Sequence, residues 1–416
     1  MKLLPVPGER QRTSTRLSSV RKTTEFFTLP GKTPRAHGKS SRGDCSGALS
    51  RKWTAILLGY GRKIGAVLGD PDHYGAAYGA AGGTLGTNLG SVAALLFVLF
   101  IFFAYMHVFK RQMKRERNVK VDPFSYTLKV LIITIIPVLL STTVYNISGI
   151  IDQGIFKNVA LLQGYSDHQI DLWWGVFTGK YKLLINVPIS IASAMAASSV
   201  PTLTASFAAN DMEIVRTQIY AANRFVMVIA FPCAIGLAAL GKPIFTLLFP
   251  GTVATADMAA TMMWVGAMAV VFYAMSTLSN GLLQGINRLK VPVVNAAIAL
   301  VTHIIVLIIL MLFLRLNIYA VVISNMFFAF AMCILNSRAI RKYSGYKQEI
   351  VKTFVIPAIA SLIMGVIAFF AYKGIYFVIK SNAIATVLSI LIAMVVYAVT
   401  LLLCKGLTEE IGRAHV

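Results

Sequence analysis

Long apolar runs alternate with short polar or basic segments along most of this chain. A transmembrane helix needs about 20 consecutive, predominantly apolar residues, and runs of that length recur here too often for a soluble domain. Nine windows qualify: roughly 89–109, 128–151, 183–205, 219–240, 258–283, 291–314, 317–336, 353–372 and 383–404. The pattern therefore predicts an all-α protein, a polytopic transmembrane helical bundle of about nine membrane spans.

Composition supports a membrane protein and argues against nucleic acid as a partner. Only 13% of the 416 residues are charged, whereas soluble domains carry about 25% charged residues. The net charge of +23 is concentrated in residues 1–52 and between the apolar runs, which is the positive-inside pattern of membrane proteins. The four cysteines show no disulfide or metal-ligand spacing. We expect no metal and no cofactor.

Lysine and arginine are divided unevenly between the two sets of connecting segments. One set holds fourteen of them, including six in 110–120 and five in 338–352, and the opposite set holds seven. Because basic residues are retained on the cytoplasmic side, the first set is predicted inside, together with the C-terminus. The connection 152–182 then lies outside, where Trp173 and Trp174 are interpreted as interfacial anchors rather than as a sugar-stacking platform.

The two ends of the chain differ from its apolar centre. Residues 1–52 are rich in Arg, Ser, Thr, Pro and Gly and show no apolar periodicity, which predicts a disordered basic tail or translation from a different reading frame. The last six residues, 411–416, match the translation of a common sequencing adapter. We therefore expect the membrane core, about 55–410, to be a fragment of a longer protein.

The strongest candidates for function are polar residues beside the connection 152–182. A charge at the centre of a bilayer costs about 2.5–3.5 kcal/mol, so charges at span ends are the first place to look. Asp152 ends one predicted span and is either a polar residue at headgroup level or an interior acid that pairs with a base or coordinates a cation. Lys182 and Asn186 open the next span on one helix face. The lysine either snorkels to the interface or meets a phosphate.

Four further residues are candidates for lining a cavity. Arg224 opens the span 219–240 and is interpreted either as a topological anchor or as a contact to the substrate. Asn280, Gln284 and Arg288 recur every fourth residue, which predicts one shared helix face near the inner mouth.

Sequence signatures of an enzyme are absent. The chain has no His-Glu-x-x-His motif, no Gly-x-Ser-x-Gly motif and no acid pair at glycosidase spacing, so we predict no catalytic residues. His303 falls inside a span and is interpreted as a packing residue rather than a proton relay. Asp167, His168 and Asp171 come nearest to a reactive cluster, and a solvated loop explains them as well.

Four stretches of sequence together resemble a known family. They are Gly-Ala-Ala-Tyr-Gly-Ala-Ala-Gly-Gly-Thr-Leu-Gly-Thr (75–87), Ile-Ile-Pro-Val-Leu-Leu-Ser-Thr-Thr-Val-Tyr-Asn-Ile-Ser-Gly-Ile-Ile-Asp-Gln (135–153), Asn-Val-Pro-Ile-Ser-Ile-Ala-Ser-Ala-Met-Ala-Ala-Ser-Ser-Val-Pro-Thr-Leu (186–203) and Gly-Leu-Leu-Gln-Gly-Ile-Asn-Arg-Leu-Lys-Val-Pro (281–292). In order and spacing they resemble the polysaccharide-biosynthesis branch of the MOP (multidrug/oligosaccharidyl-lipid/polysaccharide) exporter superfamily. Within that branch they resemble MurJ-like lipid II flippases and stage V sporulation protein B-like proteins.

The resemblance implies a MATE-like arrangement of fourteen helices, in two six-helix lobes followed by two C-terminal helices. Counted back from the C-terminus, the nine spans would be the sixth to the fourteenth. The implied organisation has five parts: a non-family tail (1–52), the end of the first lobe (53–127), the second lobe (128–336), the two C-terminal helices (337–410) and the adapter-derived tail (411–416).

The resemblance also implies a function. The chain would translocate a lipid-linked oligosaccharide across the bacterial cell membrane by alternating access, with membrane lipids and an unidentified coupling ion as further partners. Lys182, Asn186 and Arg224 would meet the polar head, and Asp152 would pair with a base or couple the ion. Two alternatives stay open: a cation-coupled multidrug exporter of the same superfamily, and a membrane enzyme of glycolipid assembly.

Overall fold

The computed structural model describes residues 42–69, 71–115, 123–249 and 253–404, and every element that it describes is helical. The chain divides into two compact units, residues 1–121 and 122–416. This division falls close to the predicted border at 127/128, while the functional meaning given to the five predicted parts stays a prediction.

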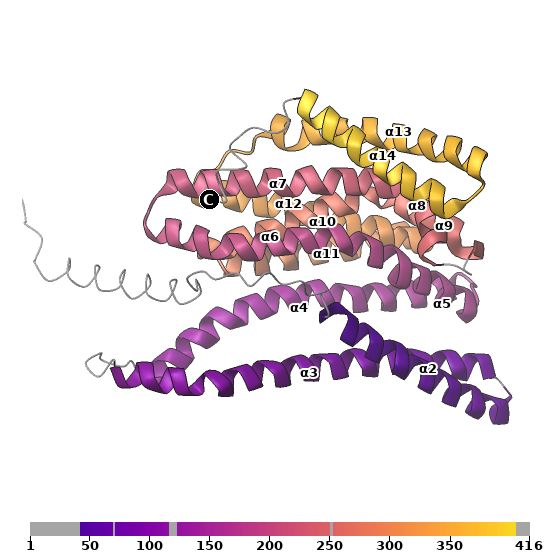
Figure 1. Ribbon diagram of the computed structural model, residues 1–416, viewed down its shortest axis with the longest axis horizontal. Helices are drawn as coiled ribbons and strands as arrows, with labels where there is room; N and C mark the ends of the chain where they lie inside the picture. Colours follow the sequence, from indigo (N-terminus) through magenta and orange to yellow (C-terminus); the bar gives the residue numbers. More distant parts are fainter. Residues whose placement is uncertain (1–41, 70, 116–122, 250–252, 405–416) are drawn as a thin grey trace, which may run out of the picture. The chain divides into compact units, whose positions relative to one another are not determined.

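The first unit is a pair of helices packed against each other, α2 (Arg42–Leu68) and α3 (Pro71–Arg115) (Figure 1). Glycines make the close approach possible. A β-carbon on Gly82 would collide with the carbonyl oxygen of Trp53, and one on Gly61 would collide with the carbonyl oxygen of Tyr74. The glycine-rich segment before the first span is therefore a helix-packing surface, as small residues in membrane helices commonly are.

The start of α2 corrects the prediction for the basic tail. Helix begins at Arg42, so the last part of the segment predicted to be disordered, 42–52, is helical. An established helix extends at low cost once its first turn has formed, and the apolar residues from Trp53 onward supply that turn. Residues 1–41 and 411–416, on which the other predictions about the ends fall, lie outside the described residues.

The second unit contains the remaining helices. They are α4 (Phe124–Leu162), α5 (Asp167–Val176), the π-helical turn η1 (Phe177–Tyr181), α6 (Lys182–Ala208), α7 (Met212–Ala239), α8 (Gly241–Leu248), α9 (Val253–Val265), α10 (Ala267–Gly285), α11 (Lys290–Leu312), α12 (Ile318–Ser344), the π-helical turn η2 (Val351–Val355), α13 (Ile356–Ile379) and α14 (Asn382–Leu403).

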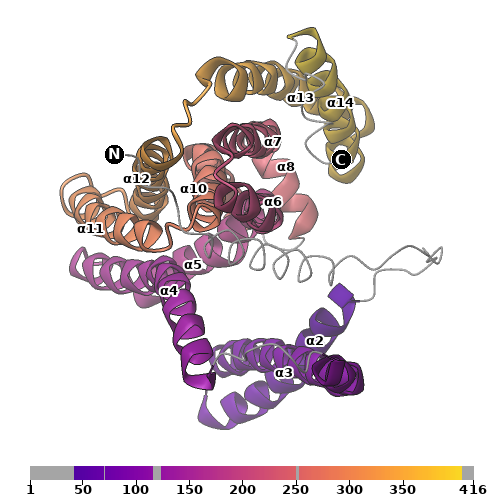
Figure 2. The same ribbon diagram turned by 90° about the vertical axis from the view of Figure 1, so that its left-hand side faces the viewer.

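Helix α10 lies at the centre of this unit and packs against α6, α7 and α12 (Figure 2). Helix α11 packs against α12 and α4, and the pair α13–α14 packs onto α7. A cluster of buried apolar side chains, among them Phe156, Met227 and Leu282, joins these helices. Most large apolar side chains on α4, α13 and α14 remain exposed, which suits surfaces that face lipid rather than water.

Seven helices among the described residues are long and apolar enough to cross a membrane, and the bent pair α9–α10 makes an eighth if it counts as one span. The prediction of an all-α polytopic membrane bundle is thereby confirmed. The ninth expected span, 128–151, falls inside α4, whose described part shows only the shorter apolar helix Phe124–Ile133. A ninth crossing stays a prediction.

The connection 152–182 is mostly helical, whereas the sequence predicted a solvated loop between two spans. Helix α4 runs on to Leu162, the chain turns at Gly164 with a φ of +88°, and helix resumes at Asp167. The helix therefore ends later than the apolar stretch predicted, because the mixed sequence that follows Asp152 still buries one helical face.

Candidate substrate and ion site

Asp152 lies inside α4 rather than at its end. Asp152, Phe156 and Ala160 are all fully buried, and their spacing of four residues places them on one helix face. The prediction that Asp152 closes the span is therefore wrong. The structure places the carboxyl group in the bundle interior, which was the other of the two interpretations. The apolar residues at 156 and 160 were the available signal for this.

Two side chains from distant parts of the chain bind the Asp152 carboxylate. His303 Nε2, on α11, lies 2.5 Å from Oδ1, and Asn325 Nδ2, on α12, donates to Oδ2 over 2.8 Å. Both side chains of the aspartate–histidine pair have no exposed surface. Buried carboxylates persist only where they are paired and hydrogen-bonded, and here each oxygen of Asp152 has a partner.

Asn325 is itself held in one orientation. Its Nδ2 also donates to the carbonyl oxygen of Val321 over 2.9 Å, and its Oδ1 accepts from the hydroxyl of Tyr273, on α10, over 3.0 Å. The ring of Phe328 meets the His303 ring edge-on, with centroids 5.9 Å apart. A buried polar network of this kind joins four helices, α4, α10, α11 and α12, at one point.

Lys182 lies next to this network, at the start of α6. A β-carbon built on Gly149 would lie 3.9 Å from Lys182 Nζ, so the ammonium lies over α4 one turn before Asp152. The Nζ atom is also 4.9 Å from the centre of the Phe177 ring, and the Asp152 carboxylate interacts with it electrostatically. The structure thus brings Asp152 and Lys182 together, although 30 positions separate them in the chain.

The backbone before Lys182 is irregular. The π-helical turn Phe177–Tyr181 ends immediately before it, and Pro188, which lacks an amide hydrogen, follows within two turns. Single π-helical turns inside helices are frequent at functional sites. Asn186 is exposed and lies four residues after Lys182, so the two side chains share one face of α6.

Arg224 occupies a different environment from the one expected. Helix α7 begins at Met212, seven residues before the predicted start, so Arg224 lies in its fourth turn. Its guanidinium is fully buried, and Nη1 donates to the hydroxyl of Tyr220 over 2.9 Å. The predicted contact to the substrate stays a prediction, and it would require this side chain to leave its buried position.

A second hydrogen bond fixes the helix beside Arg224. Asn223 Nδ2 donates to the hydroxyl of Tyr346 over 3.4 Å. Tyr346 lies in the connection after α12, and burial raises the pKa of its hydroxyl. The phenol therefore stays neutral well above neutral pH, so it can serve as an acceptor and a donor without bringing a charge into the packing.

The three inner-mouth candidates are dispersed. Asn280 Oδ1 accepts from Asn336 Nδ2 over 2.8 Å, inside a buried network with Ser279 and Asn295. Gln284 is half-buried. Helix α10 ends at Gly285 and Asn287 has a φ of +58°, so Arg288 leaves the expected shared face. Its guanidinium stacks instead on Tyr343, 4.3 Å from the ring centre.

An apolar cavity of about 610 Å³ lies on another face of α6. It is bounded by Leu184, Val187 and Pro188 together with apolar side chains of α7, α13 and α14. These α6 residues face away from Lys182 and Asn186, because positions two, five and six residues after Lys182 point to the opposite side of a helix. Helix α6 therefore separates a polar face from an apolar cavity.

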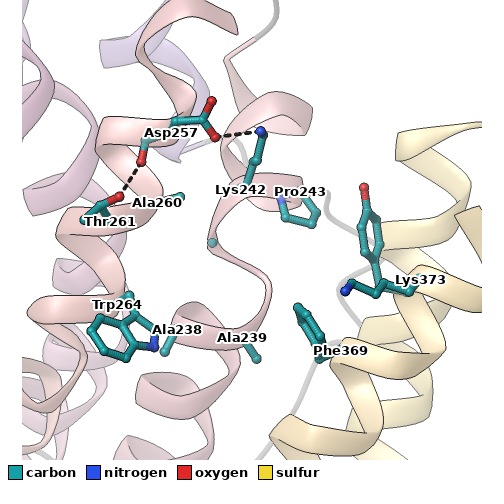
Figure 3. A pocket seen from close by; sticks show the side chains of 12 residues that line it. Ala238, Ala239, Lys242, Pro243, Asp257, Ala260, Thr261, Trp264, Phe369 and Lys373 are labelled. Atoms are coloured by element: carbon teal, nitrogen blue, oxygen red, sulfur yellow. Dashed lines mark hydrogen bonds and ion pairs between the residues drawn. The ribbon is translucent and has the colours of Figure 1, made fainter.

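A smaller hollow of about 410 Å³ lies where α7 ends, between α9 and α13 (Figure 3). Lys242 and Asp257 point toward each other and form an ion pair of 2.6 Å, so their charges cancel. Lys373 lies 4.5 Å from the Phe369 ring, and Trp264 is 73% exposed. Exposed lysines and aromatic rings at span ends are typical of the membrane interface.

Of the three residues considered for an enzyme in the outer connection, Asp167 has a structural role: it lies in the first turn of α5 and pairs with Lys157 at 3.5 Å, while His168 and Asp171 are exposed. Ser166 caps the same helix by accepting from the amide of Gln169. A negative charge at a helix N-terminus interacts favourably with the helix dipole and stabilises the helix. Trp173 and Trp174 are half-buried against Phe156. No group of three potential metal ligands occurs among the described residues.

The sequence did not reveal which residues bind the Asp152 carboxylate. His303 was interpreted as a packing residue, and neither Asn325 nor Tyr273 was singled out. The signal that could have found them is simple: each is a polar side chain within an apolar helix. Such residues are rare in membrane spans and generally face the bundle interior.

The fold defines an all-α polytopic membrane protein, and its interior contains this buried polar network. A search of protein-family models finds no match. The chain is 23% identical over 218 residues to the lipid II flippase MurJ of Bacillus subtilis (strain 168), a match that covers 52% of this chain and 39% of that protein. The chain thus spans about two-fifths of the length of this curated relative.

A solved structure supports the same relationship at the level of the fold. The lipid II flippase MurJ in an inward closed conformation superposes with a TM-score of 0.54 and 17% identity, over 92% of this chain and 68% of that chain. An outward-facing multidrug resistance MATE family transporter of the MOP superfamily aligns with a TM-score of 0.38, too weakly to carry an argument. The chain is thus similar to MurJ in sequence and in fold, which confirms the resemblance to MurJ-like flippases predicted from the four sequence stretches.

Proposed function

We propose that this protein is a flippase for lipid-linked oligosaccharides, such as a lipid II-like precursor or a polysaccharide repeat unit, that works by alternating access in a bacterial cell membrane. The observation that carries the proposal is the position of Lys182. A half-buried ammonium opens an apolar helix, one turn from a buried acid, and an exposed amide, Asn186, shares its face. A cation with hydrogen-bond donors beside it suits a phosphate group.

The surroundings fit a substrate that is polar at one end and apolar along its length. The cavity of about 610 Å³ on the other face of α6 is lined almost entirely by apolar side chains, and a volume in the range of about 300–1,000 Å³ is typical of ligand pockets. An apolar chain of a membrane lipid suits this cavity. The similarity to MurJ, described as a lipid II flippase, supports the same substrate class.

Within this proposal the remaining candidates have different tasks. Asp152 pairs with bases and fixes the network beside Lys182. Asn280, Gln284 and Arg288 lie at the end of α10 and would line the inner side of the path. The cytoplasmic position of the C-terminus follows from the distribution of Lys and Arg in the connections. The roles in transport of all these residues are part of the proposal.

Binding of a defined lipid tests the proposal. The purified chain in lipid nanodiscs should bind a fluorescent lipid with a disaccharide–pyrophosphate head more tightly than the matching prenol without phosphate. Replacing Lys182 by Ala should weaken binding of the pyrophosphate lipid about 10- to 100-fold, since a hydrogen bond to a charged group contributes roughly 1.5–3 kcal/mol. Transport would then be followed as arrival of the head at the opposite leaflet of proteoliposomes.

Lys157 provides the matched control. It is an exposed lysine that pairs with Asp167, so Lys157→Ala removes the same charge from the protein and should leave binding unchanged. Equal affinity for the pyrophosphate lipid and the prenol, or equal effects of Lys182→Ala and Lys157→Ala, would contradict the proposal.

A further inference from the structure

His303 is a buried base to which the proposed transport function assigns no task. Its Nε2 atom lies 2.5 Å from Asp152 Oδ1. Because a carboxylate only accepts hydrogen bonds, Nε2 carries the hydrogen and the lone pair of the neutral ring is on Nδ1. Nδ1 is buried, and no hydrogen-bond partner for it occurs among the described residues. The ring therefore has a vacant proton-accepting atom within a site that already contains a carboxylate.

Asp152 has two basic side chains within reach. His303 contacts it directly, and Lys182 Nζ lies over α4 at Gly149, one turn away. With a neutral imidazole, the charges of Asp152 and Lys182 sum to zero. With an imidazolium, the positive charge of His303 neutralises Asp152, and the positive charge of Lys182 then has no counter-charge in the pair. In an apolar interior an unbalanced charge is costly, so only one of the two bases is needed to neutralise the acid.

We propose that Asp152 and His303 form a proton-binding site, and that occupation of this site frees Lys182 for an anionic head group. A hydronium ion of the solvent gives its proton to Nδ1 of His303: one O–H bond breaks, one N–H bond forms, and a water molecule is released. The imidazolium then replaces Lys182 as the balancing partner of Asp152, and the ammonium can turn toward the open face that it shares with Asn186. This inference rests on the proposed function, because the anion is the phosphate of the lipid-linked substrate.

Apart from Lys182, the side chains described around Asp152 and His303 are uncharged. Helix α12 contributes the neutral side chains of Asn325 and Phe328, and α10 contributes the hydroxyl of Tyr273, which bonds to Asn325. Lys182, from the start of α6, is the charged group shown to act on Asp152 across the described contacts. Histidine is the side chain whose charge ordinarily changes closest to neutral pH, so pH is the variable that tests this site.

Nuclear magnetic resonance of ¹⁵N-histidine tests the proton site without any substrate. In the purified chain, the His303 signal, identified by its loss in His303→Gln, should change from imidazole to imidazolium as the pH is lowered from 8 to 5. In Lys182→Met the competing cation is gone, so the imidazolium signal should persist at pH values where the wild type has lost it. A His303 signal that stays neutral down to pH 5 in both proteins would overturn the inference.

The pH dependence of lipid binding tests the coupling to Lys182. The disaccharide–pyrophosphate lipid is a suitable probe, because both phosphates are esterified and keep their charge over this range. Its affinity for the wild type should rise on the order of tenfold from pH 8 to pH 6, as expected for a coupled pair of sites. His303→Gln should give a flat profile, and the exposed-residue control His168→Gln should retain the wild-type slope.

The two experiments separate the inference from the proposed function. Binding that is specific for pyrophosphate but independent of pH would leave the flippase proposal intact and overturn the proton coupling. A His303 signal that titrates and depends on Lys182, without binding of the lipid at any pH, would support the proton site and contradict the proposed substrate. If His303→Gln does not fold, the His303 signal is assigned by elimination, from the signals lost in variants of the other five histidines, and Lys182→Met then decides the matter.

Discussion

At the scale of single residues, the carboxylate of Asp152 connects α4 to α11 and α12. It accepts from Asn325 and contacts His303, and both partners are buried. A buried donor that loses its acceptor keeps the full cost of its desolvation, about 1–3 kcal/mol. The stability of the second unit should therefore depend on whether position 152 can still accept and donate hydrogen bonds.

The first prediction concerns this position. Asp152→Ala should lower the free energy of unfolding by about 1–3 kcal/mol, since it leaves the Asn325 and His303 donors without an acceptor. Asp152→Asn should cost less, because its amide oxygen can still accept from Asn325 and its NH₂ group can donate to neutral His303. Denaturant unfolding of the chain in nanodiscs would measure both. Asp171→Ala, on the exposed surface of α5, is the control, and an equal effect of that variant would refute the prediction.

At the scale of helices, close packing between α6 and α10 depends on a missing side chain. A β-carbon on Gly281 would lie 2.7 Å from the β-carbon of Ala196 and 3.3 Å from its α-carbon. Because the neighbour is a short side chain on a helix backbone, it cannot turn aside. Within 190–199 it is Ala196 that has this packing role, and Ala192 is buried as well. Small residues at helix contacts are a general feature of membrane bundles.

The second prediction compares two glycines in helices. Gly281→Ala should reduce the free energy of unfolding by about 1–3 kcal/mol, the usual cost of overpacking a filled contact. Gly154→Ala, on α4, meets nothing within 4 Å and should instead gain up to about 1 kcal/mol from helix propensity. Denaturant unfolding in the same nanodiscs would measure the difference. Similar effects of the two substitutions would show that α6 and α10 do not approach this closely.

At the scale of the whole molecule, charge in the connecting segments should set the orientation in the membrane. Basic residues gather in one set of connections, and the energetic reason is the retention of Lys and Arg on the cytoplasmic side. The apolar surfaces of α13 and α14 and the exposed rings at the span ends are compatible with either orientation, because they report depth rather than side.

The third prediction follows from that orientation. In a variant without other cysteines, a membrane-impermeant maleimide added to intact cells should label His168→Cys on α5 but should not label Cys404 at the end of α14. Both positions are exposed in the described structure, so accessibility of the thiol is not limiting. Labelling after the cells are opened serves as the control. The reverse pattern in intact cells would invert the proposed topology.

Sequence reasoning found the membrane class and the region of the candidate site but not its partners. The structure brings Asp152 and Lys182, both singled out from the sequence, close to each other, while their role in a site stays a prediction. The end of α4 was missed, because Asp152 was taken as the boundary although Phe156 and Ala160 continue its buried face. Arg288 was placed on a helix that ends three residues earlier, at Gly285.

The sequence by itself determined the helices, their membrane location and the resemblance to the MOP superfamily. Each of these properties depends on residues that are close in the chain, since an apolar run of sufficient length partitions into lipid wherever it lies. Only the tertiary structure decided that Asp152 meets His303 and Asn325, which are 151 and 173 positions away. Helical periodicity predicts which face of a helix is buried. The packing of α4, α11 and α12 determines which side chains contact that face.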